Sequence, residues 1–169
     1  MDFTLSNEVE EYREAVRNFV DKEIIPLEAD KSNYDRHENI ALKVLKATQD
    51  KVKAAGLWAP QMPKDRGGLG FNQIGMAASY EEMNRSIFGP VCFNCSAPDD
   101  GNMFVLDRVA TKDQKDKWLQ PIIDGRVRSS FVMTEPHPGS GSDPSMMLTK
   151  AEPLGNSKWR ITGHKWFIT

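Results

Sequence analysis

The stretch that decides the fold is Ser129–Asp143, which reads SSFVMTEPHPGSGSD. It starts as a short apolar run of strand-forming residues and continues into a loop rich in glycine and serine. The glycines, Gly139 and Gly141, let backbone N–H groups approach a ligand closely. The serines, Ser140 and Ser142, add hydroxyl donors, and this combination suits phosphate oxygens. Loops of this composition also make ordinary turns, so the residues alone leave both interpretations open. No lysine follows the glycines, which excludes a Walker loop.

Around and beyond this loop the sequence has the composition and period of strands. Gly163 and His164 lie between the last two apolar segments, where glycine would supply the positive φ of a two-residue hairpin turn. The chain stops at Thr169 inside the last segment, which leads us to expect a truncated part of a larger protein. The predicted strands are SSFVM (129–133), MLTKAE (147–152), KWRIT (158–162) and KWFIT (165–169).

The first 125 residues have instead the three- and four-residue apolar spacing of helices. Prolines, glycines and capping residues set the predicted helix ends. The segment PVCFNCSAP (90–98) receives no prediction. The predicted helices are Asn7–Ile25, with Ser6 as N-cap and Pro26 as its stop; Glu38–Ala55, with Gly56 after its end; Asn72–Asn84; Asp100–Val109; and a short helix that a Thr111–Gln114 capping box opens and that ends before Pro121.

The order of these elements predicts the fold class. Helices followed by strands, without interleaving, favour an α+β protein over a doubly wound sheet. We place the domain boundary near Gly125. The predicted domains are an N-terminal all-α helical domain over residues 1–125 and a strand-rich domain that begins over residues 126–169.

Charge and composition exclude several classes of partner. The 22 basic and 24 acidic residues nearly balance, and no run of five like charges occurs, so neither nucleic acid nor an anionic membrane is expected. The N-terminus MDFTLSNEVEEYREAV is acidic and lacks an apolar core segment, unlike a secretory signal or an Arg-rich transit peptide. We therefore expect no membrane span and a cytoplasmic protein, or else a mature protein of the mitochondrial or peroxisomal matrix.

Two small sets of residues invite a metal or redox interpretation. Cys92 and Cys95 form a lone C-x-x-C, but no second pair lies at ligand spacing, which favours structural cysteines. The three histidines, His37, His137 and His164, are scattered through polar stretches and are expected at the surface. We predict no metal site.

Residues near the ends of two predicted strands allow two interpretations. Met133 and Thr134 close the first strand, where side chains and amides can face a planar ring system. Trp166 and Phe167 lie on another strand, and their rings would suit a flavin. Ordinary alternating core residues are the commoner explanation for a tryptophan and a phenylalanine in a strand. The period of the sequence does not separate the two.

Several motifs taken together resemble one enzyme family, the acyl-CoA dehydrogenases. MTEPHPGSGSD resembles the family signature in which a strand ends in Thr-Glu-Pro and a loop closes with Gly-Ser-Asp. ITGHKWFIT resembles the second signature, which lies beside the flavin. GLWAPQMPKDRGGLG, with Glu81 and Glu82 downstream, and ATKDQKDKWLQPIIDG match the helical part in family order. NCSAPDDGNM is similar to the branch that contains family members ten and eleven.

The resemblance implies a fold, a cofactor and site residues. A helical N-terminal domain would precede the start of an antiparallel β-barrel domain, and the cofactor would be FAD. The loop between Glu135 and Asp143 is two residues longer than the usual pattern, with His137–Pro138 as the extra pair. No residue of this chain matches the family's catalytic base, which the C-terminal helical domain supplies. The implied contacts are Phe131, Met133 and Thr134 to the flavin; Gly141 and Ser142 to the FAD pyrophosphate; Ser142 also to the acyl-CoA; and Phe167 and Thr169 to the ring near N5.

The function that the resemblance implies is α,β-dehydrogenation of a fatty acyl-CoA thioester to a trans-2-enoyl-CoA. An electron-transferring flavoprotein would accept the electrons, and the full-length protein would be a homo-oligomer. Because the base and much of the FAD site would lie elsewhere, the 169 residues alone are expected to be inactive. The alternatives are an acyl-CoA oxidase or flavin monooxygenase of the same fold, and a non-catalytic helical module.

Overall fold

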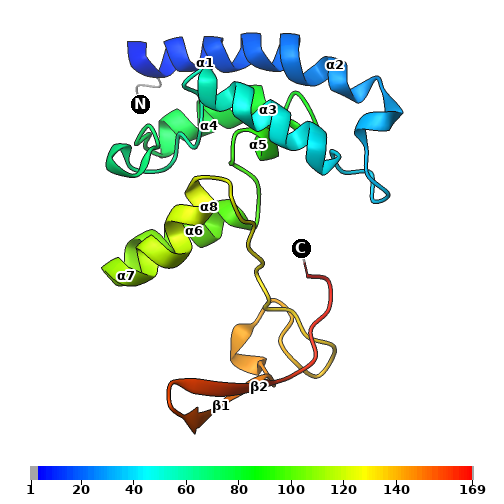
Figure 1. Ribbon diagram of the computed structural model, residues 1–169, viewed down its shortest axis with the longest axis vertical. Helices are drawn as coiled ribbons and strands as arrows, with labels where there is room; N and C mark the ends of the chain where they lie inside the picture. The colour runs from blue at the N-terminus through cyan, green and yellow to red at the C-terminus, as the bar shows by residue number, and fades with distance from the viewer. Residues whose placement is uncertain (1–3, 169) are drawn as a thin grey trace. The chain divides into compact units, whose positions relative to one another are not determined.

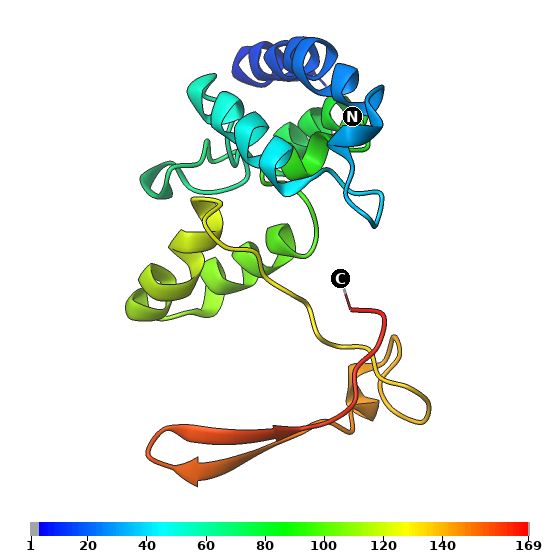
Figure 2. The same ribbon diagram turned by 45° about the vertical axis from the view of Figure 1, so that its right-hand side comes forward.

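The computed structural model describes residues 4–168, which divide into two compact units, 4–128 and 129–168. Helices build the first unit, and a loop followed by a two-stranded hairpin builds the second (Figure 1, Figure 2). This confirms the predicted order of a helical part followed by antiparallel strands. The division falls after Arg128, whereas the predicted boundary was Gly125.

The first unit consists of α-helices joined by short 3-10 and π segments. No helix within residues 4–168 is long and apolar enough to cross a membrane. The α-helices are α1 (Asn7–Phe19), α2 (Ile25–Glu28), α3 (Leu42–Ala54), α4 (Gln73–Met83), α5 (Gly89–Cys92), α6 (Asp99–Val109), α7 (Lys112–Gln114) and α8 (Gln120–Ile123); the π segments are η1 (Val20–Ile24) and η4 (Lys115–Leu119), and the 3-10 segments are η2 (Lys31–Asn33) and η3 (Lys64–Arg66).

The core of the first unit is apolar, and it includes the contact between α1 and α4. Val16, Val20 and Ile24 are fully buried along one face of α1 and η1, as the apolar stripe of the sequence predicts. Phe93 follows α5, is fully buried, and meets the ring of Phe19 edge-on at 5.7 Å between centroids. Burial of each such large side chain contributes about 1.5–3 kcal/mol to stability.

Two prolines that were predicted to end helices lie inside them. Pro26 occupies the first turn of α2, directly after the π segment η1. Pro121 occupies the first turn of α8, directly after the π segment η4. In both places the N–H just before the proline bonds to the carbonyl five residues earlier. A proline lacks an N–H and its ring crowds the carbonyl four residues back, and the wider π turn accommodates both defects. The predicted stops are therefore wrong, because the chain changes helix type instead of leaving the helix.

The second predicted helix starts later than expected. α3 begins at Leu42 and not at Glu38, because Glu38 has a positive φ of 60° that a helix does not admit. Ile40 pairs with Tyr34 in an isolated β-bridge before the helix. The end of the helix agrees with the prediction: Gly56 has a φ of 70°, and its N–H bonds to a carbonyl of the last turn.

The capping box is confirmed, and the segment that received no prediction proves to be ordered. The Gln114 N–H donates to the Thr111 hydroxyl at 3.3 Å, and the Thr111 N–H donates to the Gln114 side chain at 2.9 Å. Asn94 lies after α5, and its side-chain amide donates to the carbonyls of Ile122 and Ile123 at 3.0 and 3.1 Å. A buried polar side chain thus fastens the connection between α5 and α6 to the end of α8.

Residues 129–168 contain one antiparallel hairpin, β1 (Lys150–Gly155) with β2 (Lys158–Thr162). Asn156–Ser157 forms its turn, with φ angles of 51° and 57° that suit a two-residue hairpin turn. The predicted turn at Gly163–His164 is therefore wrong. Gly163 is small for a different reason, because a Cβ there would lie 2.0 Å from Thr149 Oγ1.

Two other predicted strands are wrong in the part of the second unit that the structure describes. Residues 129–133 and 165–168 are not strands there, since no neighbouring strand supplies a hydrogen-bonded ladder. The strand predicted at 147–152 begins only at Lys150, after the 3-10 turn η5 (Pro144–Met146). Thr169 lies outside the described residues. The alternating pattern thus identified β2 and part of β1, but not the conformation of the other two segments.

Candidate functional site

The second unit is organised around the carboxylate of Glu135, which is buried, with 4% of the residue exposed. The carboxylate accepts hydrogen bonds from the backbone N–H groups of Ser140, Leu148 and Thr149 at 3.2, 2.7 and 2.8 Å. The Thr149 hydroxyl also donates to it, and the Lys165 ammonium lies 3.0 Å away. Separate segments of the chain, around 140, 148 and 165, therefore meet at one buried charge.

These donors hold the pKa of Glu135 well below its ordinary value. The hydroxyl of Thr149 has the largest effect, and the Leu148 N–H follows. Burial opposes the shift, but the bonds from Lys165 and from the Thr149 N–H add to the lowering. The carboxylate is consequently ionised at neutral pH and stays bound to its donors.

Hydrogen bonds bring the two signature segments of the sequence side by side in this unit. The Lys165 ammonium donates to the carbonyl of Met133 at 2.9 Å. The Trp166 N–H donates to the carbonyl of Thr134 at 3.2 Å. The end of the apolar run that starts at Ser129 thus lies against the segment that follows β2.

The Gly/Ser loop has an inward half, Gly139 and Ser140, and an outward half, Gly141 and Ser142. The Ser140 hydroxyl is buried and donates to the Met133 carbonyl at 2.7 Å. Gly139 packs so closely that a Cβ would lie 2.4 Å from Glu135 Oε2. Next to Gly141, by contrast, a Cβ would meet no atom within 4 Å, and Ser142 is exposed. The outward half therefore has open space beside Gly141 and an exposed hydroxyl at Ser142.

The predicted site residues differ in how far they are exposed to solvent. Phe131 and Phe167 are exposed, Phe167 to 83%, while Met133 and Thr134 are half-buried. Phe167 has a φ of 51°, a conformation that bulky residues rarely adopt and that concentrates at ligand sites. Thr169, the last predicted residue, lies outside the described residues.

These residues fit a ligand that combines a planar apolar ring system with phosphate groups. The exposed rings of Trp166 and Phe167 lie 5.0 Å apart and offer apolar faces. Gly141 and Ser142 offer open space and a hydroxyl donor, which suit phosphate oxygens. The second unit thus contains residues of both kinds that a dinucleotide flavin would require.

Sequence reasoning did not find the residues that hold this arrangement together. In the sequence, Glu135 is the middle residue of the Thr-Glu-Pro motif and Lys165 opens a predicted strand. The one available signal was a carboxylate beside a loop of small residues, where it cannot stay buried without donors. Those donors come from segments far along the chain, so no local pattern names them.

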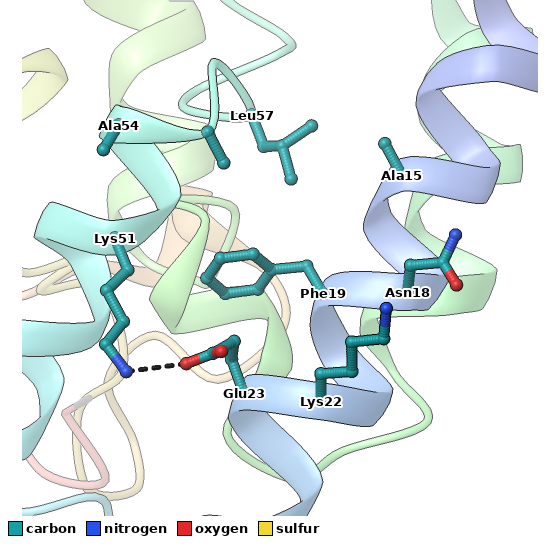
Figure 3. A pocket seen from close by; sticks show the side chains of 9 residues that line it. Ala15, Asn18, Phe19, Lys22, Glu23, Lys51, Ala54 and Leu57 are labelled. Carbon is teal, nitrogen blue, oxygen red and sulfur yellow. Dashed lines mark hydrogen bonds and ion pairs between the residues drawn. The ribbon is translucent and has the colours of Figure 1, made fainter.

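A separate groove of about 600 Å³ lies on the first unit (Figure 3). Ala15 and Phe19 of α1, together with Leu57 beyond α3, give it an apolar lining. An ion pair of 2.6 Å between Lys51 and Glu23 stands at its edge. None of the predicted site residues lines this groove.

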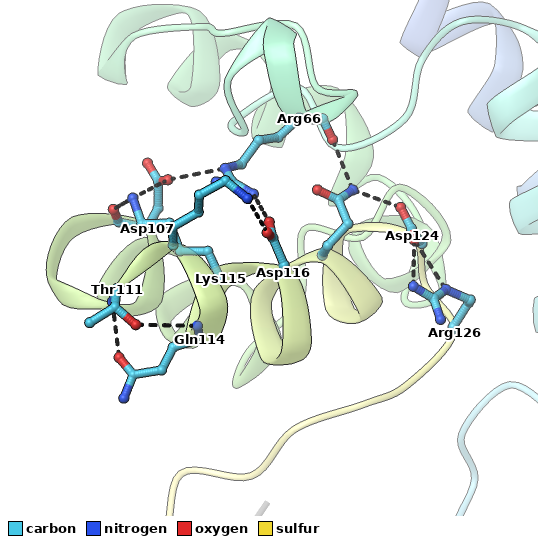
Figure 4. A network of polar contacts seen from close by, with 10 residues as sticks. Arg66, Asp107, Thr111, Gln114, Lys115, Asp116, Asp124 and Arg126 are labelled. Carbon is cyan, nitrogen blue, oxygen red and sulfur yellow. Dashed lines mark hydrogen bonds and ion pairs between the residues drawn. The ribbon is translucent and has the colours of Figure 1, made fainter.

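Arg66 stands in a polar network of the same unit (Figure 4). Its guanidinium lies 3.8 Å from a carboxylate oxygen of Asp107 and 3.8 Å from one of Asp116. Lys115 also contacts Asp107 at 3.2 Å, and the Gln120 side chain donates to the Arg66 carbonyl at 3.2 Å. These contacts connect η3 with α6, η4 and α8, and they indicate a structural role.

Of the two glutamates of α4, Glu82 is buried in ion pairs and Glu81 is exposed to solvent. Glu82 is buried and contacts Arg17 at 2.7 Å and Arg13 at 3.1 Å. Hydrogen bonds from Arg17, and then from Arg13, lower the pKa of Glu82 against the opposing effect of burial. The side chain of Glu81 is 71% exposed. Neither residue is assigned as a base.

Both cysteines are buried free thiols of the helical unit. Burial raises the pKa of Cys92 to about 12 and that of Cys95 well above its ordinary value. Thiols with raised pKa values stay protonated at neutral pH and are poor nucleophiles. Within residues 4–168, no three His, Cys, Asp or Glu side chains gather in a way that could hold a metal ion.

A helical unit followed by an antiparallel hairpin unit with an outward Gly/Ser loop defines a two-part α+β protein. Residues 6–126 match the family model described as acyl-CoA dehydrogenase, N-terminal domain. The chain therefore belongs to the acyl-CoA dehydrogenase family.

Individual relatives agree with this assignment. Mouse acyl-CoA dehydrogenase family member 10 is 34% identical over 175 residues, which cover 98% of this chain and 16% of that protein, and it belongs to the predicted branch. A structure from Mycobacterium abscessus assigned to the acyl-CoA dehydrogenases has a TM-score of 0.85 and 34% identity, covering 98% of this chain and 43% of that one. A glutaryl-CoA dehydrogenase from Mycobacterium smegmatis, solved in complex with FADH2, shares the fold with a TM-score of 0.71 and 24% identity, covering 97% of this chain and 39% of that one. This chain spans less than half the length of each of these relatives.

Proposed function

We propose that this chain supplies the helical domain and the start of the flavin-binding β-domain of an FAD-dependent acyl-CoA dehydrogenase. Family membership supports the general class of enzyme. The observation that carries the proposal is the pair of contacts from Lys165 to Met133 and from Trp166 to Thr134. They place the two sequence signatures side by side, as one shared ligand site requires.

In this proposal the second unit holds FAD through its outward residues. The exposed aromatic and half-buried residues face the ring system, and the open side of the Gly/Ser loop faces the pyrophosphate. Ser142 also contacts the acyl-CoA. The proposed flavin contacts are Phe131, Met133, Thr134, Phe167 and Thr169, and the proposed pyrophosphate contacts are Gly141 and Ser142.

The proposed reaction is α,β-dehydrogenation of a fatty acyl-CoA thioester to a trans-2-enoyl-CoA. Bound FAD would supply the hydride acceptor. The residues of this chain bind and orient the reactants and exclude water from them. We assign no residue of this chain as the base, because Glu82 and Glu135 are both buried in contacts with cationic or N–H donors. An electron-transferring flavoprotein is the proposed electron acceptor, and the full-length enzyme is proposed to be a cytoplasmic homo-oligomer.

The first test is an absorbance spectrum of the protein expressed from its complete reading frame, beside one of the 169-residue chain. The expected result is flavin bands at about 370 and 450 nm in the long form that an acyl-CoA bleaches without air, since these bands belong to the oxidised cofactor. A long form without flavin would contradict the proposal and favour a non-catalytic helical module.

Two further measurements narrow the chemistry. The 169-residue chain alone is expected to show no reduction of an electron acceptor with octanoyl- or palmitoyl-CoA. The reduced full-length protein is expected to react slowly with oxygen and rapidly with an electron-transferring flavoprotein. Rapid reaction with oxygen would instead favour an oxidase or a monooxygenase of the same fold.

A further inference from the structure

We propose that Glu135 and Lys165 form a clasp that positions two flavin-facing segments, residues 131–134 and 166–168, against one another. The inference rests on the proposed function, since the segments are proposed to face FAD. Neither residue is among the proposed cofactor contacts. They would act as positioning residues, through the backbone of the residues beside them.

The geometry of Lys165 supports this role. Its ammonium lies 3.0 Å from Glu135 Oε1 and 2.9 Å from the Met133 carbonyl oxygen, and its side chain is only 16% exposed. One cation therefore connects a buried carboxylate to the backbone of the residue just before Thr134. The next residue, Trp166, continues the contact through its N–H bond to Thr134. Moving Lys165 would displace both edges of the proposed ring site.

The surroundings of Glu135 show why this charge cannot be replaced easily. Its carboxylate also accepts hydrogen bonds from the N–H groups of Ser140, Leu148 and Thr149, of which that of Ser140 is buried. A buried donor that loses its acceptor costs more than the bond itself contributes. Breaking a buried charge pair by removing one partner also leaves an uncompensated charge. The clasp thus depends on the carboxylate as much as on the cation.

The second unit has little else to hold these segments. Among residues 129–168 the buried ones are Glu135, Gly139 and Ser140, and none of them is a large apolar side chain. The apolar side chains of Phe131 and Trp166 are 57% and 43% exposed. Among these residues, apolar packing therefore supplies no contact that could replace the clasp.

The test uses FAD binding to the full-length protein and its variants, measured by quenching of flavin fluorescence. Glu135→Gln keeps the size of the side chain but removes the charge, and Lys165→Met keeps the stem but removes the ammonium. Each is expected to weaken FAD affinity about 10- to 100-fold, because hydrogen bonds to charged groups are lost. Each variant should also loosen the ring site. The flavin absorption band at about 450 nm should therefore lose its fine structure.

Three further variants separate positioning from general stability. Lys165→Arg keeps the charge and is expected to recover most of the affinity. Glu152→Gln changes an exposed carboxylate of the same unit, and Glu82→Gln changes a buried carboxylate of the first unit. Both should leave the flavin band unchanged, even though Glu82→Gln lowers the melting temperature. The clasp is refuted if Glu135→Gln and Lys165→Met alter FAD affinity no more than Glu82→Gln does.

A double variant distinguishes a clasp from a simple ion pair. Exchanging the charges, Glu135→Lys with Lys165→Glu, restores opposite charges but places a cation against the N–H groups of Leu148 and Thr149. It is expected not to recover FAD affinity, and full recovery would overturn the role given to the carboxylate.

Hydrogen exchange of the same variants keeps this inference distinguishable from the proposed function. Loss of amide protection at Ser140, Leu148 and Thr149 in Glu135→Gln, and around Trp166 in Lys165→Met, supports the clasp without any flavin. If the variants show this pattern but the wild-type protein binds no FAD, the proposed function alone is refuted. Unchanged exchange in both variants would refute the clasp, whatever the protein binds.

Discussion

The two units of this molecule reach an ordered structure by different means. The helical unit buries large apolar side chains such as Val16, Ile24 and Phe93 completely. In residues 129–168 the buried side chains of Glu135 and Ser140 are polar, and the large apolar side chains are largely exposed. The first kind of order comes from non-directional packing, and the second comes from directional bonds to one charge. The comparison predicts that each unit fails under a different perturbation.

The largest expected difference between the two units is the loss of amide protection in acid. The pKa of Glu135 in the folded unit lies below its ordinary value of 4.5, so its contribution to stability is complete above that pH. As the pH falls below 4.5 towards the folded pKa, the carboxylate takes up a proton and this contribution is lost progressively. Amide protection at Ser140, Leu148 and Thr149 should therefore fall in acid, while the core of the helical unit stays protected.

Hydrogen exchange over a pH series, corrected for the intrinsic rates, measures this difference. Glu135→Gln supplies the control, because it removes the titrating group and should abolish the acid dependence at these amides. Acid loss that persists in Glu135→Gln would assign the effect to other carboxylates. Glu82, whose pKa is also lowered, is the candidate for any acid loss in the helical unit.

Removal of a core side chain should have the next largest effect, and only in the helical unit. Phe93→Ala empties a fully buried site beside Phe19 and is expected to destabilise this unit by about 3–5 kcal/mol. Urea denaturation followed by helical circular dichroism measures the change. Phe104→Ala is the matched control, because Phe104 is 41% exposed and its loss should cost about 1 kcal/mol or less. Equal effects of the two variants would contradict the packing that we describe.

The same contrast explains which parts of the structure the sequence could predict. The apolar stripe that includes Val16 and Val20 is a local, periodic signal, and the helix it predicts is present. The capping box at Thr111 is also local and is also present. Pro26 is the exception, because the sequence marks a proline but not the π turn that accommodates it. Apolar burial in helices can be predicted because neighbouring residues carry the information.

The candidate site could be predicted only in part, because it depends on pairing between distant segments. The sequence located the segments around Thr134 and Trp166 but not the bond that joins them. It suggested Gly163 as a turn residue, whereas that glycine makes room for Thr149. It did not indicate that Ser140 points inward while Ser142 is exposed. Contacts of this kind depend on direction and on long-range partners, which a periodic pattern does not encode.

Two glycines of the loop test whether close packing around Glu135 contributes to the stability of the second unit. Gly139→Ala places a methyl group 2.4 Å from Glu135 Oε2 and is expected to destabilise this unit by about 1–3 kcal/mol. Gly141→Ala adds the same methyl group where no atom lies within 4 Å, so it should leave stability nearly unchanged. Hydrogen exchange at Leu148 and Thr149 reports the difference. Equal exchange in the two variants would show that the close packing around Glu135 does not contribute to the order of the unit.

The smallest expected effect tests whether directional bonds matter equally in the helical unit, at the start of α7. Thr111→Ala removes the hydroxyl that accepts the Gln114 N–H, and it should cost about 1 kcal/mol of helical stability. Thr111→Ser keeps the hydroxyl and should retain nearly all of that stability. Urea denaturation of the two variants gives the comparison. Since the apolar core remains intact in both, loss of this cap should lower the midpoint without disordering the unit, unlike loss of the charge at Glu135. Collapse of the helical unit in Thr111→Ala would mean that it, too, depends on single polar contacts.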